Sequence, residues 1–94
     1  MKTYLIEREI PGASELTAEE LHGITGTSND AVASLGKPYE WLHSYVAGDK
    51  VYCFHQAENA EIVREHSRRG NFPANLVAEV SSVFDRTGPR GLPA

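Results

Sequence analysis

The sequence predicts an α+β protein, in which two helices cover one face of a four-stranded antiparallel sheet. Segments with strand and helix patterns follow one another in the order strand, helix, strand, strand, helix, strand. Apolar side chains alternate in the first strand segment and recur every three or four positions in the first helix segment. The 94 residues suffice for one hydrophobic core but not for two. This order of elements is the βαββαβ arrangement of the ferredoxin-like fold.

The first strand is predicted over residues 2–10, because β-forming side chains alternate there between two faces. Ile6 and Arg8 point to one face, whereas Leu5 and Glu7 point to the other. A Pro-Gly pair follows and ends the strand with turn chemistry.

Residues 17–35 form the first predicted helix. Thr17 and Glu20 make a capping box at its start, and Gly36 suits the left-handed position after its end. Gly26 lies mid-helix, where a glycine costs about 1 kcal/mol relative to alanine, so a kink or break is expected there. Five residues at spacings of three and four mark the buried stripe: Leu21, Ile24, Ser28, Val32 and Leu35.

A hairpin is predicted from two strands, residues 39–46 and 51–56, around a loop of three residues containing a glycine. In this register His43 lies opposite Cys53, and Trp41 lies opposite His55. Strict alternation also places three side chains on one face of the first strand, namely Trp41, His43 and Tyr45. Cys53 and His55 share a face of the second strand, and His55 is expected at an edge or an interface.

The second helix is predicted over residues 59–69, with His66 on its apolar side and therefore directed at the sheet. The last strand covers residues 76–83. Glycine and proline dominate from position 85 onward. We therefore expect a single domain over residues 1–84, followed by a flexible C-terminal tail over residues 85–94.

Large apolar side chains occupy both faces of the predicted hairpin. Helices can cover only one face, and a sheet that is apolar on both sides is normally covered on both sides. A second copy of the chain is the simplest cover for the other face. The sequence therefore predicts a homodimer, in the form of a dimeric α+β barrel.

Composition and charge exclude several classes of protein. The net charge of −4 and the lack of a basic stripe argue against nucleic-acid binding. No apolar run has the length of a membrane span, and the first residues do not resemble a signal peptide. A single cysteine cannot form an internal disulfide, which fits a reducing compartment. The expectation is a cytoplasmic protein that binds neither nucleic acid nor membrane.

One constellation of side chains suggests chemistry. His43, Cys53 and His66, with Glu7 as a fourth member, offer imidazole, thiolate and carboxylate ligands that suit nickel, zinc or copper. They come from separate elements and form no short motif. The alternative is structural, because a buried Glu7 and a buried His66 could simply satisfy each other's hydrogen-bonding needs.

Several runs of residues resemble a known family: Tyr4–Arg8, Trp41–Val46, Asp49–Lys50, Tyr52–Cys53, Arg64–His66 and Phe72–Ala74. The chain resembles the small bacterial ferredoxin-like domains, first classed as of unknown function, that are labelled nickel-binding. The resemblance extends to about Val83. It implies a homodimer that binds nickel, with the metal associated with the dimer surface. The family pattern has a tyrosine where this chain has His55.

Three functions remain open from the sequence. The first is a dimeric protein that binds nickel or another divalent transition metal. The second is a small cofactor-free enzyme of the dimeric α+β-barrel type, using Cys53 or His43 on a small organic substrate. The third is a regulatory interaction module that uses only its dimer surface.

Overall fold

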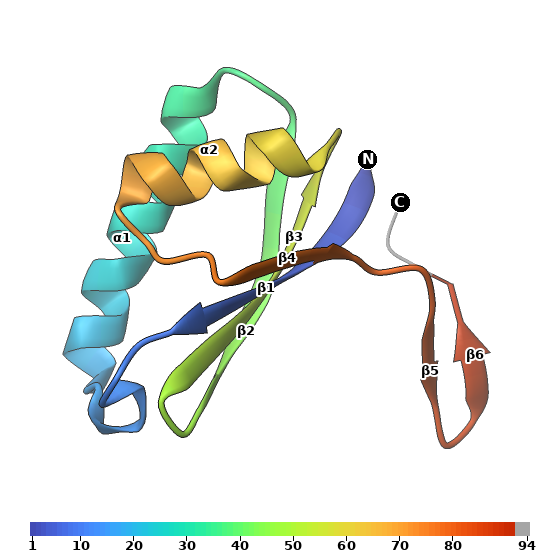
Figure 1. Ribbon diagram of the computed structural model, residues 1–94, viewed down its shortest axis with the longest axis horizontal. Coiled ribbons are helices and arrows are strands. Elements are labelled where there is room, and N and C mark those ends of the chain that lie inside the picture. The colour runs from blue at the N-terminus through green and yellow to red at the C-terminus, as the bar shows by residue number, and fades with distance from the viewer. Residues whose placement is uncertain (92–94) are drawn as a thin grey trace.

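The computed structural model describes residues 1–91 and has the predicted ferredoxin-like architecture. Four antiparallel strands form the main sheet in the spatial order β2–β3–β1–β4. Their bounds are Lys2–Glu9 for β1, Tyr39–Ala47 for β2, Lys50–Ala57 for β3 and Leu76–Glu79 for β4. Helices α1 (Ala18–Leu35) and α2 (Ala60–Gly70) pack on one face of this sheet (Figure 1). We call the helix-covered face the inner face and the opposite one the outer face.

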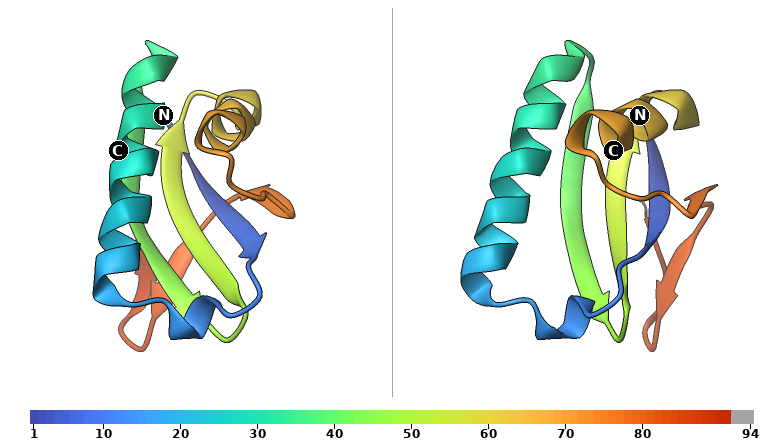
Figure 2. Two further views of the ribbon diagram at one scale, coloured as in Figure 1. Left: turned by 90° about the vertical axis from the view of Figure 1, so that its left-hand side faces the viewer. Right: turned by 60° about the vertical axis from the view of Figure 1, so that its left-hand side comes forward.

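The hydrophobic core lies between the inner face and the helices. Ile6 of β1 and Val63 of α2 are fully buried, and Tyr4, Tyr39, Cys53 and Ala57 complete the strand side of the cluster. Figure 2 shows α1 alongside the hairpin of β2 and β3. No helix within residues 1–91 combines the length and apolar content needed to cross a membrane.

Helix α1 begins as predicted. The Thr17 side chain accepts a hydrogen bond from the Glu20 amide, and the Glu20 carboxylate accepts one from the Thr17 amide. Gly36 takes the left-handed conformation after the last turn, with φ of 62°. The expected break at Gly26 is absent, because α1 runs without interruption from Ala18 to Leu35. A glycine penalty of about 1 kcal/mol is small against the tertiary packing that holds the rest of the helix.

The predicted hairpin register is wrong by one residue at the turn and by one residue within β2. Ala47 pairs with Lys50, so the loop contains only Gly48 and Asp49, and Gly48 supplies the positive φ of 60°. A β-bulge then interrupts the pairing between Trp41 and His43. Because of these two shifts, Trp41 still lies opposite His55, as predicted.

The bulge redistributes the side chains of β2 between the two faces. His43 pairs with Phe54, and Ser44 takes the position opposite Cys53 that was predicted for His43. The prediction that Trp41 and His43 share a face is therefore wrong, because an extra residue reverses the alternation beyond it. Cys53 and His55 do share the inner face, as predicted.

Helix α2 follows the prediction closely. Asn59 caps its start by accepting a hydrogen bond from the Ile62 amide, and Asn71 ends it in the left-handed conformation with φ of 56°. His66 points at the sheet and is fully buried.

The C-terminal part departs from the prediction. Strand β4 ends at Glu79, and the chain then forms a separate hairpin of β5 (Val83–Asp85) and β6 (Gly88–Arg90), which extends away from the main sheet in Figure 1. A one-turn helix, η1 (Ala13–Glu15), precedes α1. The predicted boundary after residue 84 falls inside β5, so residues 85–90 belong to a hairpin. Residues 92–94 of the predicted tail lie outside the described part, and the tail's flexibility stays a prediction.

Candidate functional site

The structure divides the four predicted metal ligands between the two faces of the sheet. Cys53 and His66 lie on the inner face, whereas Glu7 and His43 lie on the outer face. No group of three or more His, Cys, Asp or Glu side chains within residues 1–91 is placed to hold a metal ion. The four residues therefore do not form the predicted metal-binding cluster. The bulge in β2 turns His43 to the outer face, and the alternation of side chains along β1 turns Glu7 to the same face.

On the outer face, His43 is exposed and packs between two aromatic rings. Its ring centre lies 4.9 Å from that of Phe54 and 5.1 Å from that of Tyr45. Glu7 accepts a 2.5 Å hydrogen bond from Lys50 Nζ, and this bond raises the pKa of Lys50. Glu7 and His66 therefore do not pair with each other, in contrast to the structural alternative.

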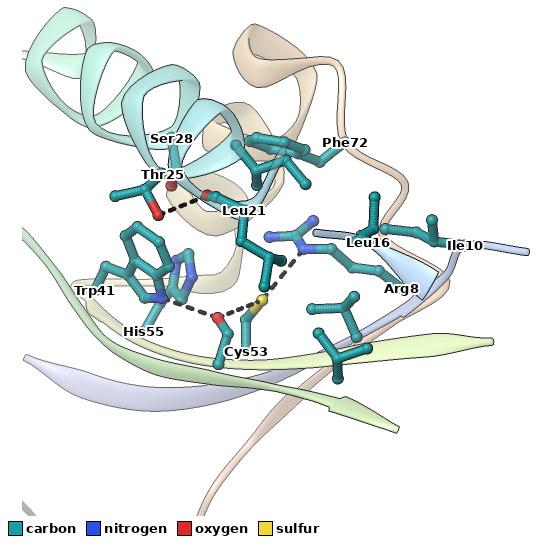
Figure 3. Close-up of a pocket in the computed structure, with 14 residues that line it drawn as sticks. Arg8, Ile10, Leu16, Leu21, Thr25, Ser28, Trp41, Cys53, His55 and Phe72 are labelled. Carbon is teal, nitrogen blue, oxygen red and sulfur yellow. Dashed lines mark hydrogen bonds between the residues drawn. The ribbon is translucent and has the colours of Figure 1, made fainter. Parts of the chain in front are cut away.

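The inner face holds a pocket of about 260 Å³ between α1 and the β2–β3 hairpin (Figure 3). Its walls are mainly apolar and include Leu16, Leu21, Ile24, Trp41 and Val51. The site thus offers a partly open apolar volume, and its polar groups are few.

Polar groups gather on the sheet side of the pocket. Trp41 Nε1 donates to Ser44 Oγ over 2.9 Å, and Ser44 Oγ donates to Cys53 Sγ over 3.0 Å. Arg8 Nε donates to the same sulfur over 3.5 Å (Figure 3). His43 lies on the other face, so it cannot act as a base for Cys53, and an enzyme that used Cys53 as its nucleophile would need a different base.

Arg8 is a cation buried among neutral partners. Only 3% of the residue is exposed. Its Nη1 donates to Ser67 Oγ over 3.0 Å and to the Pro73 carbonyl over 2.7 Å, and its guanidinium carbon lies 5.3 Å from the centre of the Phe72 ring. No carboxylate within residues 1–91 forms an ion pair with it.

Two histidines and a tyrosine form a buried aromatic cluster beside the pocket. The ring centres of His55 and His66 are 5.0 Å apart, and the Tyr39 ring stacks on His66 at 5.1 Å. The Tyr39 hydroxyl bonds Nδ1 of His55, and Ser28 Oγ lies 3.0 Å from Nε2 of His66. The expectation that His55 lies at an edge or interface is wrong, since the residue is 1% exposed.

Burial keeps both imidazoles neutral. Desolvation, then the charges of His66 and Arg8, lowers the pKa of His55 to about 2. Desolvation and the charge of Arg8 lower the pKa of His66 to about 4, against the opposing effect of a hydrogen bond to the Ser28 backbone. Burial also raises the pKa of Tyr39, so its hydroxyl stays protonated and can donate to His55. Nδ1 of His66 is buried without a hydrogen-bond partner in the described part of the chain. A buried lone pair at this nitrogen costs less free energy than a buried, unpaired N–H would.

Sequence reasoning missed Arg8, His55 and Tyr39 as members of the site. For Arg8 a signal existed, because a charged residue occupies an inward position of an alternating strand, next in line after Tyr4 and Ile6. No comparable pattern marks Tyr39, whose role depends on the tertiary approach of α2.

Comparison with known proteins assigns a family to this fold. A family model described as nickel-responsive protein SCO4226-like matches residues 4–80. The chain is a member of the SCO4226-like family. The crystal structure of SCO4226 from Streptomyces coelicolor A3(2) is similar to this SCO4226-like protein, with a TM-score of 0.69 over 84% of this chain and 95% of that one. At 18% identity, this similarity shows the shared fold. No curated protein matches the chain.

The polar groups on the inner face of this SCO4226-like protein are not suited to binding a nickel ion. Imidazole nitrogens suit nickel, and the unpartnered Nδ1 of His66 is such a donor. However, Tyr39 occupies Nδ1 of His55, and the Arg8 guanidinium lies close enough to lower the pKa of both imidazoles. A charge that disfavours a proton on these rings also disfavours a metal cation there.

Proposed function

We propose that this SCO4226-like protein is a homodimer that binds nickel on its outer face, with ligands from both subunits. The observation that carries the proposal is an exposed histidine, His43, within an aromatic surface on the face that no helix covers. Membership of a family described as nickel-responsive supports the choice of metal.

The outer face has the composition of an interface. Its apolar members are Leu5, Tyr45, Tyr52, Phe54 and Leu76, which we call the outer patch. Tyr45 and Leu76 are 59% and 44% exposed. Aromatic residues are enriched at the cores of protein interfaces, and an apolar sheet face on a monomer is unfavourable in water.

A two-fold axis through the outer patch would double each ligand. A C2 interface presents the same surface twice, so the exposed imidazole of His43 becomes two, and so does the Glu7 carboxylate that Lys50 pairs with in one chain. Imidazole and carboxylate groups are suitable ligands for a divalent transition metal. The absence of a three-ligand cluster within residues 1–91 of one chain is then expected, because the site needs both copies.

Nickel titration by calorimetry, joined to a mass measurement by light scattering, tests the proposal. The wild-type protein should have twice the mass of one chain and bind nickel. His43→Ala should weaken nickel binding at least tenfold, while His22→Ala, a change to another exposed histidine, should leave it unaltered. Tyr45→Glu should give a monomer that has lost the nickel site. Unchanged nickel affinity in His43→Ala, or full affinity in a monomeric Tyr45→Glu protein, would refute this function.

A further inference from the structure

The pocket on the inner face contains a charge that the protein itself does not neutralise. Arg8 lines the pocket and is 97% buried, as its exposed fraction of 3% implies. A buried ion without a counter-ion is expensive, and buried guanidinium groups are normally paired with a carboxylate or a phosphate. The hydrogen-bond acceptors of Arg8 are the sulfur of Cys53, the hydroxyl of Ser67 and the carbonyl of Pro73. None of these acceptors is a carboxylate.

The guanidinium also has unused hydrogen-bonding capacity. Nε and Nη1 bond to protein atoms, whereas Nη2 forms no hydrogen bond with any residue in the range 1–91. Figure 3 shows the Arg8 guanidinium among the residues that line the pocket, with a dashed line to the sulfur of Cys53. The N–H groups of Nη2 are therefore left to a ligand, and a carboxylate oxygen can accept a charge-assisted hydrogen bond from this nitrogen.

We propose that this pocket binds a small amphipathic monocarboxylate, with its carboxylate on Arg8 and its apolar part against Leu21, Ile24 and Trp41. The remaining polar groups do not favour a cation or a strongly polar ligand. Trp41, Ser44 and Cys53 bond to one another, and burial keeps His55 neutral. The charge complement of the pocket is therefore a single anionic group attached to an apolar body.

The volume limits the size of this ligand. A cavity of about 150 Å³ in a protein core holds a benzene molecule. The pocket of about 260 Å³ accommodates such a ring with a short chain and a carboxylate, or an unbranched acid of similar bulk. This inference does not depend on the proposed nickel site, because the ligand contacts the inner face only.

Calorimetric titration with 3-phenylpropionate tests the proposal, with the neutral 3-phenylpropionamide as a matched ligand of the same shape. The acid should bind at least tenfold more tightly than the amide, because only the acid neutralises Arg8. Equal affinity for the two would refute the proposal, as would the absence of binding at about 10 mM acid, a concentration well above a weak Kd of about 1 mM.

Protein variants locate the binding. Arg8→Gln should weaken binding of the acid at least tenfold, but it removes hydrogen bonds to Ser67 and Pro73 and could prevent folding. Leu21→Trp at the pocket rim is the second variant; Leu21 is already 37% exposed, so its replacement fills the pocket without changing the core. We expect at least a tenfold loss in Leu21→Trp and less than a twofold change in His22→Trp, its exposed neighbour. Retained affinity in folded Leu21→Trp would refute the assignment.

Discussion

Lowering the pH should destabilise the protein through two buried histidines. His55 and His66 have pKa values lowered from 6.5 to about 2 and about 4 in the folded protein. Below pH 6.5, His55 and His66 therefore become protonated in the unfolded chain but stay neutral in the folded chain. Because the unfolded state binds more protons, the free energy of unfolding falls as the pH falls, from about pH 6.5 down to the folded pKa of each ring.

The expected loss can be worked out from these values. Each imidazole that stays neutral in the folded protein lowers the free energy of unfolding by about 1.4 kcal/mol per pH unit below 6.5. At pH 5 this loss is about 2 kcal/mol for each ring. The two together give about 4 kcal/mol, a large share of the 5–15 kcal/mol that stabilises a typical domain. Carboxylates with lowered pKa values, Glu65 and Asp85, titrate below their ordinary values of 4.5 and 3.8, so they do not contribute in this window.

Urea unfolding between pH 8 and pH 5, followed by the fluorescence of Trp41, measures this effect. The wild-type free energy of unfolding should fall with a slope near 2.7 kcal/mol per pH unit around pH 5, about 1.4 for each of two protons. His66→Gln should halve that slope whatever it does to stability at pH 8, and His22→Ala should leave the slope unchanged. A wild-type loss smaller than about 1 kcal/mol between pH 8 and pH 5 would refute the reasoning, since even one neutral ring should cost more.

Three further predictions concern the fold itself, and chemical unfolding at pH 7.5 measures each of them. Thr17→Ala removes the cap of α1 and should cost about 1 kcal/mol, whereas an unchanged stability would mean that the capping box is dispensable. Ile6→Ala leaves a cavity at a fully buried position and should cost about 2–5 kcal/mol; a loss below 1 kcal/mol would contradict its place in the core. Gly70→Ala would put a Cβ in steric conflict with the Phe72 ring and should cost about 1–3 kcal/mol, with a gain in stability as the contrary result.

Local patterns were sufficient to predict most of the fold. The capping box at Thr17, the left-handed residue after α1 and the inward direction of His66 each depend on spacings within one helix, and each is confirmed. The alternation of β1 also holds, with Ile6 and Arg8 buried on the inner face. Such features follow from backbone geometry that neighbours in sequence define.

The candidate site could not be predicted with the same success, because it depends on one extra residue in β2. Strict alternation from Trp41 carries His43 to the inner face, but the bulge between them carries it to the outer face. No turn residue or glycine marks this bulge in the sequence, and a bulge of one residue reverses every side chain beyond it. The environment of Arg8 likewise depends on Ser67 and Pro73, which are 59 and 65 positions away along the chain.

The two faces of the sheet have opposite electrostatic preferences, although they are built from the same strands. Arg8 and the neutral imidazoles of the inner face disfavour a cation and favour an anion. The neighbouring position in β1 carries Glu7, which points outward and is paired with Lys50, while the exposed His43 on the same face offers an imidazole nitrogen to a metal ion. Alternation along β1 places these two charges next to each other in the sequence and on opposite sides of the backbone. A substitution on one face should therefore change affinity for one kind of ligand and leave affinity for the other within a small factor, so that the nickel and monocarboxylate proposals can fail separately.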